Sequence, residues 1–316
     1  MPGDIRHDWK FEEVESLYNR PFLDLIHQAR EIHCQYHDAS AVQRCTLLSI
    51  KTGGCPEDCA YCPQSSHYDT GVVREGLMPL DKVLGAARRA RAAGASRFCM
   101  GAAWRDVREG PDFDRVLEMV SGVAQEGMEV CVTLGMLTAR QAFRLKQAGL
   151  TAYNHNLDTS PAYYPKIIST RTYEERLATL KNVSEAGISV CCGGIVGMGE
   201  SRQDRCDLLR VLANLEPHPE SVPVNLLVRA PGTPLEATAD LDPFEFVRTV
   251  ATARLLMPRA RVRMSAGRTS LSRETQALCF MAGANSIFFG DQLLTTPNPE
   301  IEADLDLLAS LGLRTS

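Results

Sequence analysis

Apolar positions along this chain alternate between two kinds of segment, helical patterns and short β-rich runs. The helical patterns cover 81–93, 112–126, 138–148, 172–186, 201–215, 243–257 and 272–282. Several end in a small residue followed by glycine, as at Ala93-Gly94 and Ala148-Gly149, and a β-rich run comes next. Glycine at the carboxyl end of a helix followed by a strand is the usual connection from helix to strand. The pattern therefore predicts repeated strand–helix units.

Eight β-rich runs fit this repeat, at 45–50, 97–104, 128–136, 150–158, 188–197, 221–228, 261–267 and 285–290. Eight strands alternating with helices predict an α/β fold, a (β/α)8 TIM-type barrel. A doubly wound open sheet is the alternative, because strand count alone does not establish closure. Helical patterns also predict an N-terminal helical extension (1–40) packed outside the barrel domain (41–316), and a helical tail after Pro299.

Composition narrows the class of protein. A net charge of −5 over 316 residues argues against a nucleic-acid partner, because proteins that bind nucleic acid usually have an excess of basic residues. The start of the chain is polar, with Arg6, His7 and Asp8, and no apolar run reaches membrane-spanning length. Eleven cysteines without an export signal favour a reducing compartment and metal or catalytic use. We expect a cytoplasmic protein with no membrane contact.

Three cysteines, Cys55, Cys59 and Cys62, form a CxxxCxxC run directly after the first predicted strand. Loops at that end of the strands form the active sites of barrels. A typical cubane iron–sulfur cluster takes four thiolates, so three leave one iron open to another ligand. Zinc is the alternative metal, but zinc sites usually pair two CxxC units and no second pair lies nearby. The spacing thus indicates a cluster that acts as a reaction centre.

This run resembles the mark of the radical S-adenosylmethionine (SAM) superfamily, with the aromatic Tyr61 just before the last cysteine. The resemblance implies a [4Fe-4S] cluster whose open iron binds SAM and whose electron cleaves it to a 5′-deoxyadenosyl radical. Residues 193–200, GGIVGMGE, look like the superfamily's adenine-contacting motif, and Gly101-Ala102-Ala103 ends the second strand. We therefore expect Tyr61, Ala102 and Ile195 to contact the cofactor.

A second set of cysteines lies on the predicted strands. Strand residues alternate between faces, so Cys99, Cys131 and Cys191 are expected to point into the barrel, and Cys192 outward. Arg263 is expected to point inward as well, and a buried arginine needs an anionic or metal partner. Each cysteine alone could be a small buried hydrophobe. Together the four residues suggest a second cluster with three thiolates and a nitrogen ligand.

Matching stretches over most of the chain then narrow the resemblance to the biotin synthase family. They are SIKTGGCPEDCAYCPQSS, RFCMGAAWR, YNHNLDTSP, GGIVGMGE, SVPVN, RMSAGR, MAGANSIFFG and LLTTPNPE. The resemblance implies a [2Fe-2S] cluster on Cys99, Cys131, Cys191 and Arg263. It also implies that the enzyme inserts sulfur into dethiobiotin, the small-molecule substrate, with two SAM molecules per turnover and the [2Fe-2S] cluster as the sulfur donor. An electron-donating reductase, iron–sulfur assembly proteins and a homodimer are further implied.

The fourth strand carries polar residues at period two. Asn154, Asn156 and Asp158 are expected to face inward, where amides and a carboxylate suit the ureido ring of dethiobiotin or the ribose of SAM. The resemblance assigns substrate contact to Asn156, Asp158 and Asn225, and cofactor contact also to the first two. The alternative for Asp158 is a helix cap. His155, on the opposite face, is expected to be a satisfied core residue.

The sequence is also compatible with two other functional hypotheses. Another radical enzyme of similar fold would act on a different substrate, and it would not need all four inward residues, Cys99, Cys131, Cys191 and Arg263. An iron–sulfur carrier or scaffold would need no substrate cavity, which the polar fourth strand argues against. Cys45 opens the first strand and could face the interior near Arg263, although packing alone explains a buried cysteine.

Overall fold

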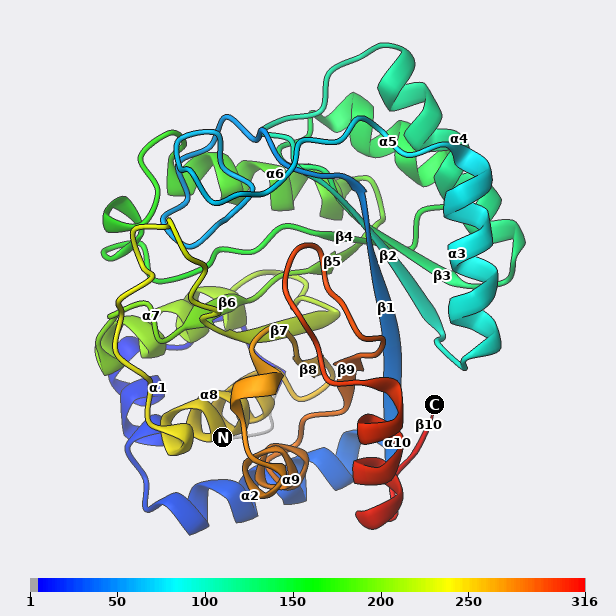
Figure 1. Cartoon of the computed structure of the whole chain (residues 1–316). Coiled ribbons are helices and arrows are strands. Elements are labelled where there is room, and N and C mark those ends of the chain that lie inside the picture. The colour runs from blue at the N-terminus through cyan, green and yellow to red at the C-terminus, as the bar shows by residue number, and fades with distance from the viewer. Residues whose placement is uncertain (1–4, 316) are drawn as a thin grey trace.

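The fold is a closed barrel of parallel strands, shown by a computed structural model that describes residues 5–315 (Figure 1). Its strands are β1 (Ala41–Lys51), β2 (Arg97–Ala102), β3 (Glu129–Thr133), β4 (Ala152–Asn154), β5 (Ser189–Cys191), β6 (Gly194–Val196), β7 (Ser221–Leu226), β8 (Arg261–Met264) and β9 (Ser286–Phe288). The last strand, β9, pairs with β1 and closes the ring. The predicted (β/α)8 barrel is confirmed, and the open doubly wound sheet is excluded.

The helices surround the strands at the predicted places. They are α3 (Leu80–Ala92), α4 (Pro111–Gln125), α5 (Ala139–Gln147), α6 (Tyr173–Glu185), α7 (Arg202–Ala213), α8 (Pro243–Leu256) and α9 (Arg273–Met281), with short 3-10 turns η1 (Tyr164–Lys166) and η2 (Arg268–Ser270). Thr138, Thr172 and Ser201 each accept a hydrogen bond from the backbone N–H three residues on, which fixes the starts of α5, α6 and α7.

The fifth predicted strand is interrupted in the structure. Backbone pairing stops after Cys191 and resumes at Gly194, so one predicted run becomes β5 and β6. A Cβ atom on Gly193 would lie 1.9 Å from the backbone oxygen of Pro223 in β7. The break therefore brings the two backbones closer than any side chain allows.

Both ends of the chain pack on the outside of the barrel. The predicted N-terminal extension, of which residues 1–4 lie outside the described part, forms α1 (Phe11–Tyr18) on α7 and α2 (Phe22–Tyr36) on α8. The predicted tail helix is α10 (Ile301–Ser310). It leads to β10 (Arg314–Thr315), which pairs with the start of β1 and was not predicted (Figure 1). Within residues 5–315, no helix is long and apolar enough to cross a membrane.

The amino-terminal end of the barrel interior is filled by an ion-paired arginine. Arg97, 1% exposed, donates from Nε to Glu129 (2.8 Å) and from Nη1 to Glu220 (3.0 Å). Gln43 donates to the same Glu129 carboxylate at 3.0 Å. This network satisfies a buried charge and closes one end of the barrel. The free space inside the barrel consequently lies toward the carboxyl ends of the strands.

Candidate active site

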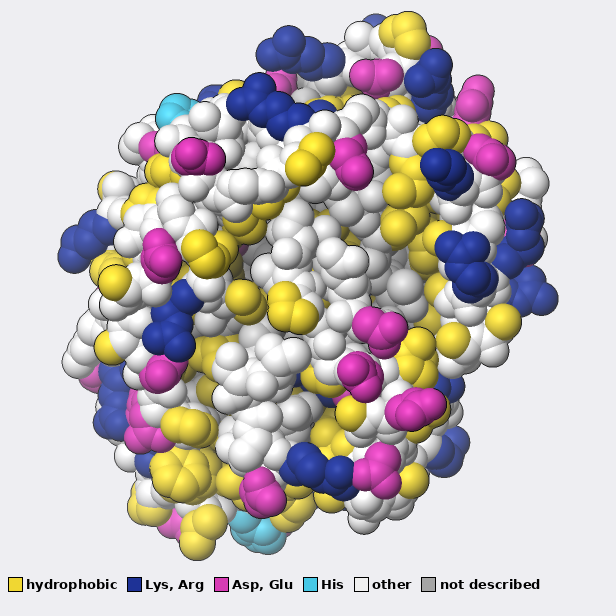
Figure 2. All heavy atoms as spheres, in the orientation of Figure 1, with side chains coloured by type: hydrophobic (Ala, Val, Ile, Leu, Met, Phe, Trp, Pro, Cys, Tyr) yellow, Lys and Arg dark blue, Asp and Glu magenta, His cyan; other side chains and the backbone are white. Residues whose placement is uncertain are grey.

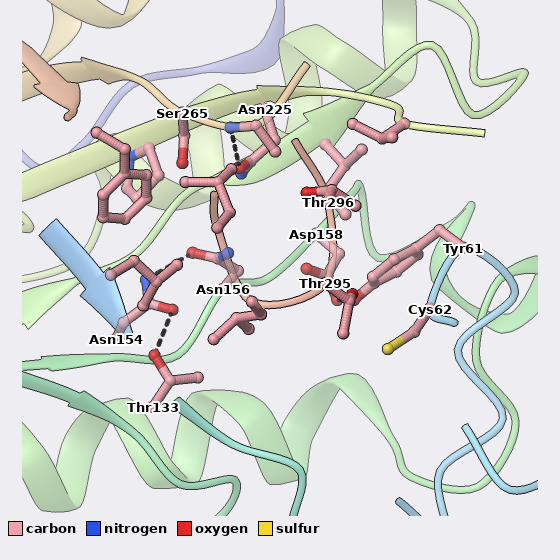
Figure 3. A pocket seen from close by; sticks show the side chains of 18 of the residues that line it. Tyr61, Cys62, Thr133, Asn154, Asn156, Asp158, Asn225, Ser265, Thr295 and Thr296 are labelled. Atoms are coloured by element: carbon pink, nitrogen blue, oxygen red, sulfur yellow. Dashed lines mark hydrogen bonds between the residues drawn. The ribbon is translucent and has the colours of Figure 1, made fainter. Parts of the chain in front are cut away.

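A cavity of about 250 Å³ lies inside the barrel at the carboxyl ends of the strands (Figure 3). Nine of the predicted site residues line it: Tyr61, Cys62, Cys99, Cys131, Asn156, Asp158, Ile195, Asn225 and Arg263. Cys55, Cys59, Cys191 and Ala102 lie outside its lining. The cavity thus connects the CxxxCxxC loop to the cysteines of the strands, which are separate in the sequence.

The CxxxCxxC loop is folded back on itself. The N–H of Cys62 donates to the oxygen of Cys59 at 2.9 Å, and the N–H of Cys55 donates to the oxygen of Gln64 at 2.9 Å. Gln64 in turn accepts from the N–H of Gly53, a glycine with φ of 70°. These bonds hold the three cysteines on one compact loop beside the cavity.

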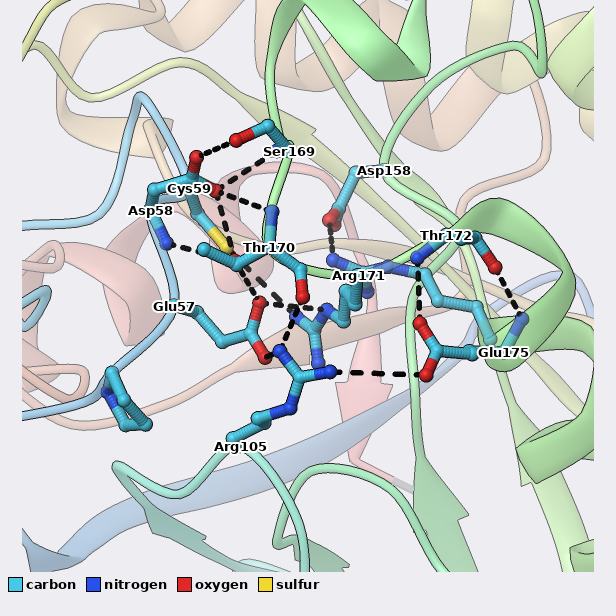
Figure 4. A network of polar contacts seen from close by, with 12 residues as sticks. Glu57, Asp58, Cys59, Arg105, Asp158, Ser169, Thr170, Arg171, Thr172 and Glu175 are labelled. Carbon is cyan, nitrogen blue, oxygen red and sulfur yellow. Dashed lines mark hydrogen bonds and ion pairs between the residues drawn. The ribbon is translucent and has the colours of Figure 1, made fainter.

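Two acidic residues between these cysteines anchor the loop to the segment before α6 (Figure 4). The Asp58 carboxylate accepts hydrogen bonds from the N–H groups of Ser169 (2.9 Å) and Thr170 (3.2 Å). Partial burial opposes ionisation of Asp58, but these bonds prevail and lower its pKa to about 2. Glu57, 2% exposed, contacts Arg105 Nη1 at 3.0 Å and Arg171 Nε at 3.7 Å. The loop is therefore held by charge-assisted contacts from two other loops.

The three loop thiols sit in surroundings that disfavour free thiolates. Burial raises the pKa of Cys59 to about 11. Burial and then the nearby Cys59 thiol raise the pKa of Cys62 to about 12, and burial raises that of Cys55. Thiolates so close together need a cation between them. The donor set fits an iron–sulfur cluster, which supplies that positive charge.

The thiols carried by β2, β3 and β5 form a second group inside the barrel. Cys99, Cys131 and Cys191 are buried in one group. The neighbouring Cys131 thiol lowers the pKa of Cys99 and Cys191, and these two thiols raise the pKa of Cys131. Cys192 packs in the outer core with the helix-facing residues. The predicted inward and outward directions are confirmed.

Arg263 completes this deeper group. It is 1% exposed, its Nε donates to Ser286 Oγ at 2.9 Å, and its Nη1 lies 3.8 Å from Cys191 Sγ. Its Nη2 is buried and has no hydrogen-bond partner among the described residues. A buried guanidinium nitrogen without a partner is costly. Three thiols and this orphaned nitrogen fit a second cluster as its ligands. Cys45, with Sγ 3.7 Å from Ser286 Oγ, does face the interior near Arg263.

The fourth strand is shorter than predicted, because β4 ends at Asn154 and Asn156 and Asp158 lie just beyond it. Asn154 and Asn156 form a hydrogen-bonded pair in the cavity wall (Figure 3). Asn154 Nδ2 donates to Asn156 Oδ1 at 3.1 Å and lies 3.4 Å from Cys191 Sγ. Gly193 N–H also donates to Asn156 Oδ1, at 3.2 Å, which leaves the Asn156 Nδ2 for a ligand. Asn225 bonds to the backbone of Gly194 and Ala266, so its amide also ties β6 to the end of β8.

Asp158 stands between the CxxxCxxC loop and α6. Its Oδ2 accepts from Tyr61 Oη at 2.8 Å and from Arg176 Nη2 at 2.5 Å. Asp158 and Arg176 are 2% and 3% exposed, and the Asp158 backbone has a φ of 66°. No helix within residues 5–315 uses this carboxylate as its cap, so that alternative is wrong. Both contacts use Oδ2, which leaves Oδ1 for a ligand.

The loop after β9 covers part of the cavity. Leu293, Leu294, Thr295 and Thr296 all line it. A Cβ atom on Gly101, at the end of β2, would lie 2.6 Å from Leu294, so glycine at this strand end makes room for the loop. On the face seen in Figure 2, side chains near the centre are mostly uncharged, and Lys and Arg lie mainly toward the edges.

Comparison with known proteins assigns the family. Residues 49–212 match the radical SAM superfamily, and residues 223–314 match the Biotin and Thiamin Synthesis associated domain. A biotin synthase of Synechococcus elongatus is 64% identical over 308 residues, which cover 98% of this chain and 96% of that protein. The chain belongs to the biotin synthase family. A member of the family from Methylobacterium is 63% identical, over 98% of this chain and 93% of its own length.

Solved structures agree on the fold. Methylornithine synthase superposes with a TM-score of 0.80 over 97% of this chain and 94% of its own, at 18% identity. The [FeFe]-hydrogenase maturase HydG of Carboxydothermus hydrogenoformans superposes with a TM-score of 0.81, over 98% of this chain and 76% of its own length, at 17% sequence identity. Identities this low show a shared barrel and nothing about substrate.

Membership of this family implies a [4Fe-4S] cluster and SAM, and the loop thiols and the cavity beside them fit both. Among residues 5–315, no three His, Cys, Asp or Glu side chains have the geometry of a site for a single metal ion. Each thiolate of a [4Fe-4S] cluster binds its own iron, so the cluster does not require that geometry.

Three features of the site were missed or misjudged from the sequence. His155 is buried away from the cavity as expected, but its Nε2 has no partner among the described residues, so it is not satisfied. Burial lowers its pKa well below the ordinary value, which keeps it neutral. Arg171 and Arg176, which contact Cys59 and Asp158, were not predicted at all. Two arginines in the run TRTYEER were the available signal.

Proposed function

We propose that this enzyme inserts sulfur into dethiobiotin to form biotin, in a radical reaction that uses one SAM for each of the two C–H bonds replaced. The observation that carries the proposal is the similarity to biotin synthases along 98% of the chain. Two groups of cysteines beside one cavity support it, because the reaction needs a radical source and a sulfur source within reach of one substrate.

We assign the two groups to two clusters. Cys55, Cys59 and Cys62 would hold the [4Fe-4S] cluster, and Cys99, Cys131, Cys191 and Arg263 would hold a [2Fe-2S] cluster. When bound, the first supplies the electron that cleaves SAM to a hydrogen-abstracting radical, and the second supplies sulfur. The orphaned Nη2 of Arg263 supports the second assignment, because only a further partner in the interior would compensate its burial.

The polar side chains in and just beyond β4 would bind and orient the two small molecules. Asn156 offers a free N–H₂ group, which suits the carbonyl of the ureido ring. Asp158 offers Oδ1 as an acceptor for ureido N–H groups or ribose hydroxyls, and Arg176 keeps the carboxylate in place. Asn225, Tyr61 and Ile195 would add contacts along the cavity wall. Ala102, at the end of β2 and outside that wall, would contact the cofactor as the family resemblance implies.

The closed end of the barrel would protect the reaction. Arg97 and its two carboxylates block the amino-terminal side, and the loop at 293–296 covers the other. A carbon radical reacts with whatever lies nearest, so excluding water and fixing the substrate both favour the intended bond. The barrel would thereby hold the substrate carbon near the strand thiols.

Further partners follow from this chemistry. A low-potential reductase would supply electrons, and iron–sulfur assembly proteins would rebuild the consumed cluster. A homodimer is proposed from the resemblance alone. Eleven cysteines, all free among the described residues, favour a reducing cytoplasmic setting. We retain 1–40 as an N-terminal extension and 41–316 as one barrel domain.

The test is anaerobic reconstitution followed by incubation with dethiobiotin, SAM and a reductant. Biotin and 5′-deoxyadenosine should both form, and Mössbauer spectra should show both cluster types. Cys131→Ala should lose the [2Fe-2S] signal and biotin formation while it retains cleavage of SAM. A fully reconstituted protein with one cluster type would refute the two-cluster assignment.

A further inference from the structure

Arg171 lies against a cysteine of the CxxxCxxC loop without lining the cavity (Figure 4). Its Nη2 is 3.9 Å from Cys59 Sγ, and its side chain is only 9% exposed. A guanidinium stays protonated in proteins, so this is a permanent positive charge at the thiol. Neither the sequence motif nor the cavity includes this residue.

Glu57 determines where that charge sits. Its carboxylate, itself buried in the loop, contacts Arg171 Nε at 3.7 Å and Arg105 Nη1 at 3.0 Å, and accepts from the Thr170 hydroxyl. Arg105 also donates to the Thr170 backbone oxygen and lies 3.7 Å from Glu175. Two guanidinium groups therefore share one buried carboxylate beside Cys59.

The charge acts on the energetics of electron transfer. One-electron reduction of a thiolate-bound cluster adds one unit of negative charge, and no bond or proton changes at Arg171. Cluster potentials depend on nearby charge and on hydrogen bonds to the sulfurs. In a buried site a guanidinium in contact with one thiolate stabilises the more negative, reduced form.

We propose that Arg171 is a positioning residue that raises the reduction potential of the cluster on Cys55, Cys59 and Cys62. Glu57 holds the guanidinium against Cys59 and, as an anion, partly offsets its charge. The inference rests on the proposed function only in taking these cysteines as cluster ligands. The electron comes from an external low-potential one-electron donor. The higher cluster potential produced by Arg171 makes reduction by that donor more favourable.

The test is a redox titration of the anaerobically reconstituted holoenzyme without SAM, followed by EPR, with iron and sulfide measured for each variant. Arg171→Met should lower the midpoint potential by an amount equal to about tenfold in the oxidised-to-reduced ratio, or about 60 mV for one electron. Arg171→Lys, which keeps the charge and loses the planar fork, should shift it in the same direction by less. Glu57→Gln should raise it.

The opposite directions of the potential shifts expected for Arg171→Met and Glu57→Gln distinguish an electrostatic effect from a loosening of the CxxxCxxC loop. Loosening alone would lower iron content in both variants without opposite potential shifts. Arg144→Met, which breaks solvent-exposed ion pairs with Glu109 and Asp114, is the matched control and should leave the potential unchanged.

Unchanged potentials in Arg171→Met and Glu57→Gln, or shifts of the same sign, would overturn the inference. If Arg171→Met binds no iron, Arg171→Lys and Glu57→Gln decide by the same criterion. These results are independent of the proposed function, which fails only if wild-type holoenzyme makes no biotin.

Discussion

Replacing Asp158 by Asn would remove one half of a fully buried ion pair. Asp158 and Arg176 are 2% and 3% exposed, with 2.5 Å between Oδ2 and Nη2. Removing one partner of such a pair costs about 3–5 kcal/mol, because the other charge stays buried without compensation. Asn is tolerated at the Asp158 φ of 66°, so backbone strain adds little.

The remaining contacts of Arg176 place the cost at the lower end of that range. Its Nε still donates to Tyr164 Oη at 2.7 Å, and its Nη1 to the Asn156 backbone oxygen. We expect Asp158→Asn to lower the unfolding free energy by about 3 kcal/mol. Arg176→Met should cost a similar amount, because the carboxylate then retains only the Tyr61 hydroxyl. The double variant should cost at least about 2 kcal/mol less than the sum.

The assay is urea unfolding of the cluster-free protein, followed by circular dichroism and fluorescence. Coincident transitions would justify a single free energy for each variant. Asp306→Asn breaks an exposed ion pair with Arg273 and is the matched control, with an expected change below about 0.5 kcal/mol. The reasoning would be refuted if the losses of unfolding free energy were additive in the double variant, or if Asp158→Asn lowered the unfolding free energy no more than the control does.

Three other predictions concern the scaffold. Burial and then Arg254 lower the pKa of His37 from 6.5 to about 4, so stability present above pH 6.5 should fall as the pH drops toward 4. His37→Gln should flatten that slope in urea midpoints measured across this range. Gly193→Ala should cost about 3 kcal/mol in the same assay, because its Cβ would lie 1.9 Å from the Pro223 oxygen. Gly187→Ala, with open space around its Cβ and a φ of 69°, should cost only about 1 kcal/mol. Cys45→Ser should change stability by less than about 1 kcal/mol and leave the iron content unchanged, since a hydroxyl can replace the thiol's contacts with Gln43 and Ser286. A fall in iron per chain would instead show that this thiol takes part in the deeper site.

Local periodicity was enough to predict the barrel and the direction of its inward residues. A strand alternates strictly, so once the runs were placed, Cys99, Cys131 and Arg263 could point only one way. The starts of helices could be predicted for the same reason. Thr138 and Ser201 cap their helices through hydrogen bonds to the backbone only three residues further along the chain.

Contacts between distant residues could not be predicted in this way. Arg176 meets Asp158 and Arg171 meets Cys59 through loop conformations that no repeat encodes. The break at Gly193 depends on the approach of β7, and β10 depends on where the tail returns to β1. His155 followed the alternation correctly, yet its unpartnered Nε2 depends on neighbours from other elements.

The shared cavity imposes an order on events. Cys62 lies at one part of its wall and Cys99 and Cys131 at another, so the space that a substrate fills is also the space beside the deeper thiols. If those thiols hold the proposed sulfur-donating cluster, iron and sulfide that reach them through this space must do so while it is empty. Turnover and cluster repair would then exclude one another, and a bound substrate would inhibit the regeneration of its own enzyme.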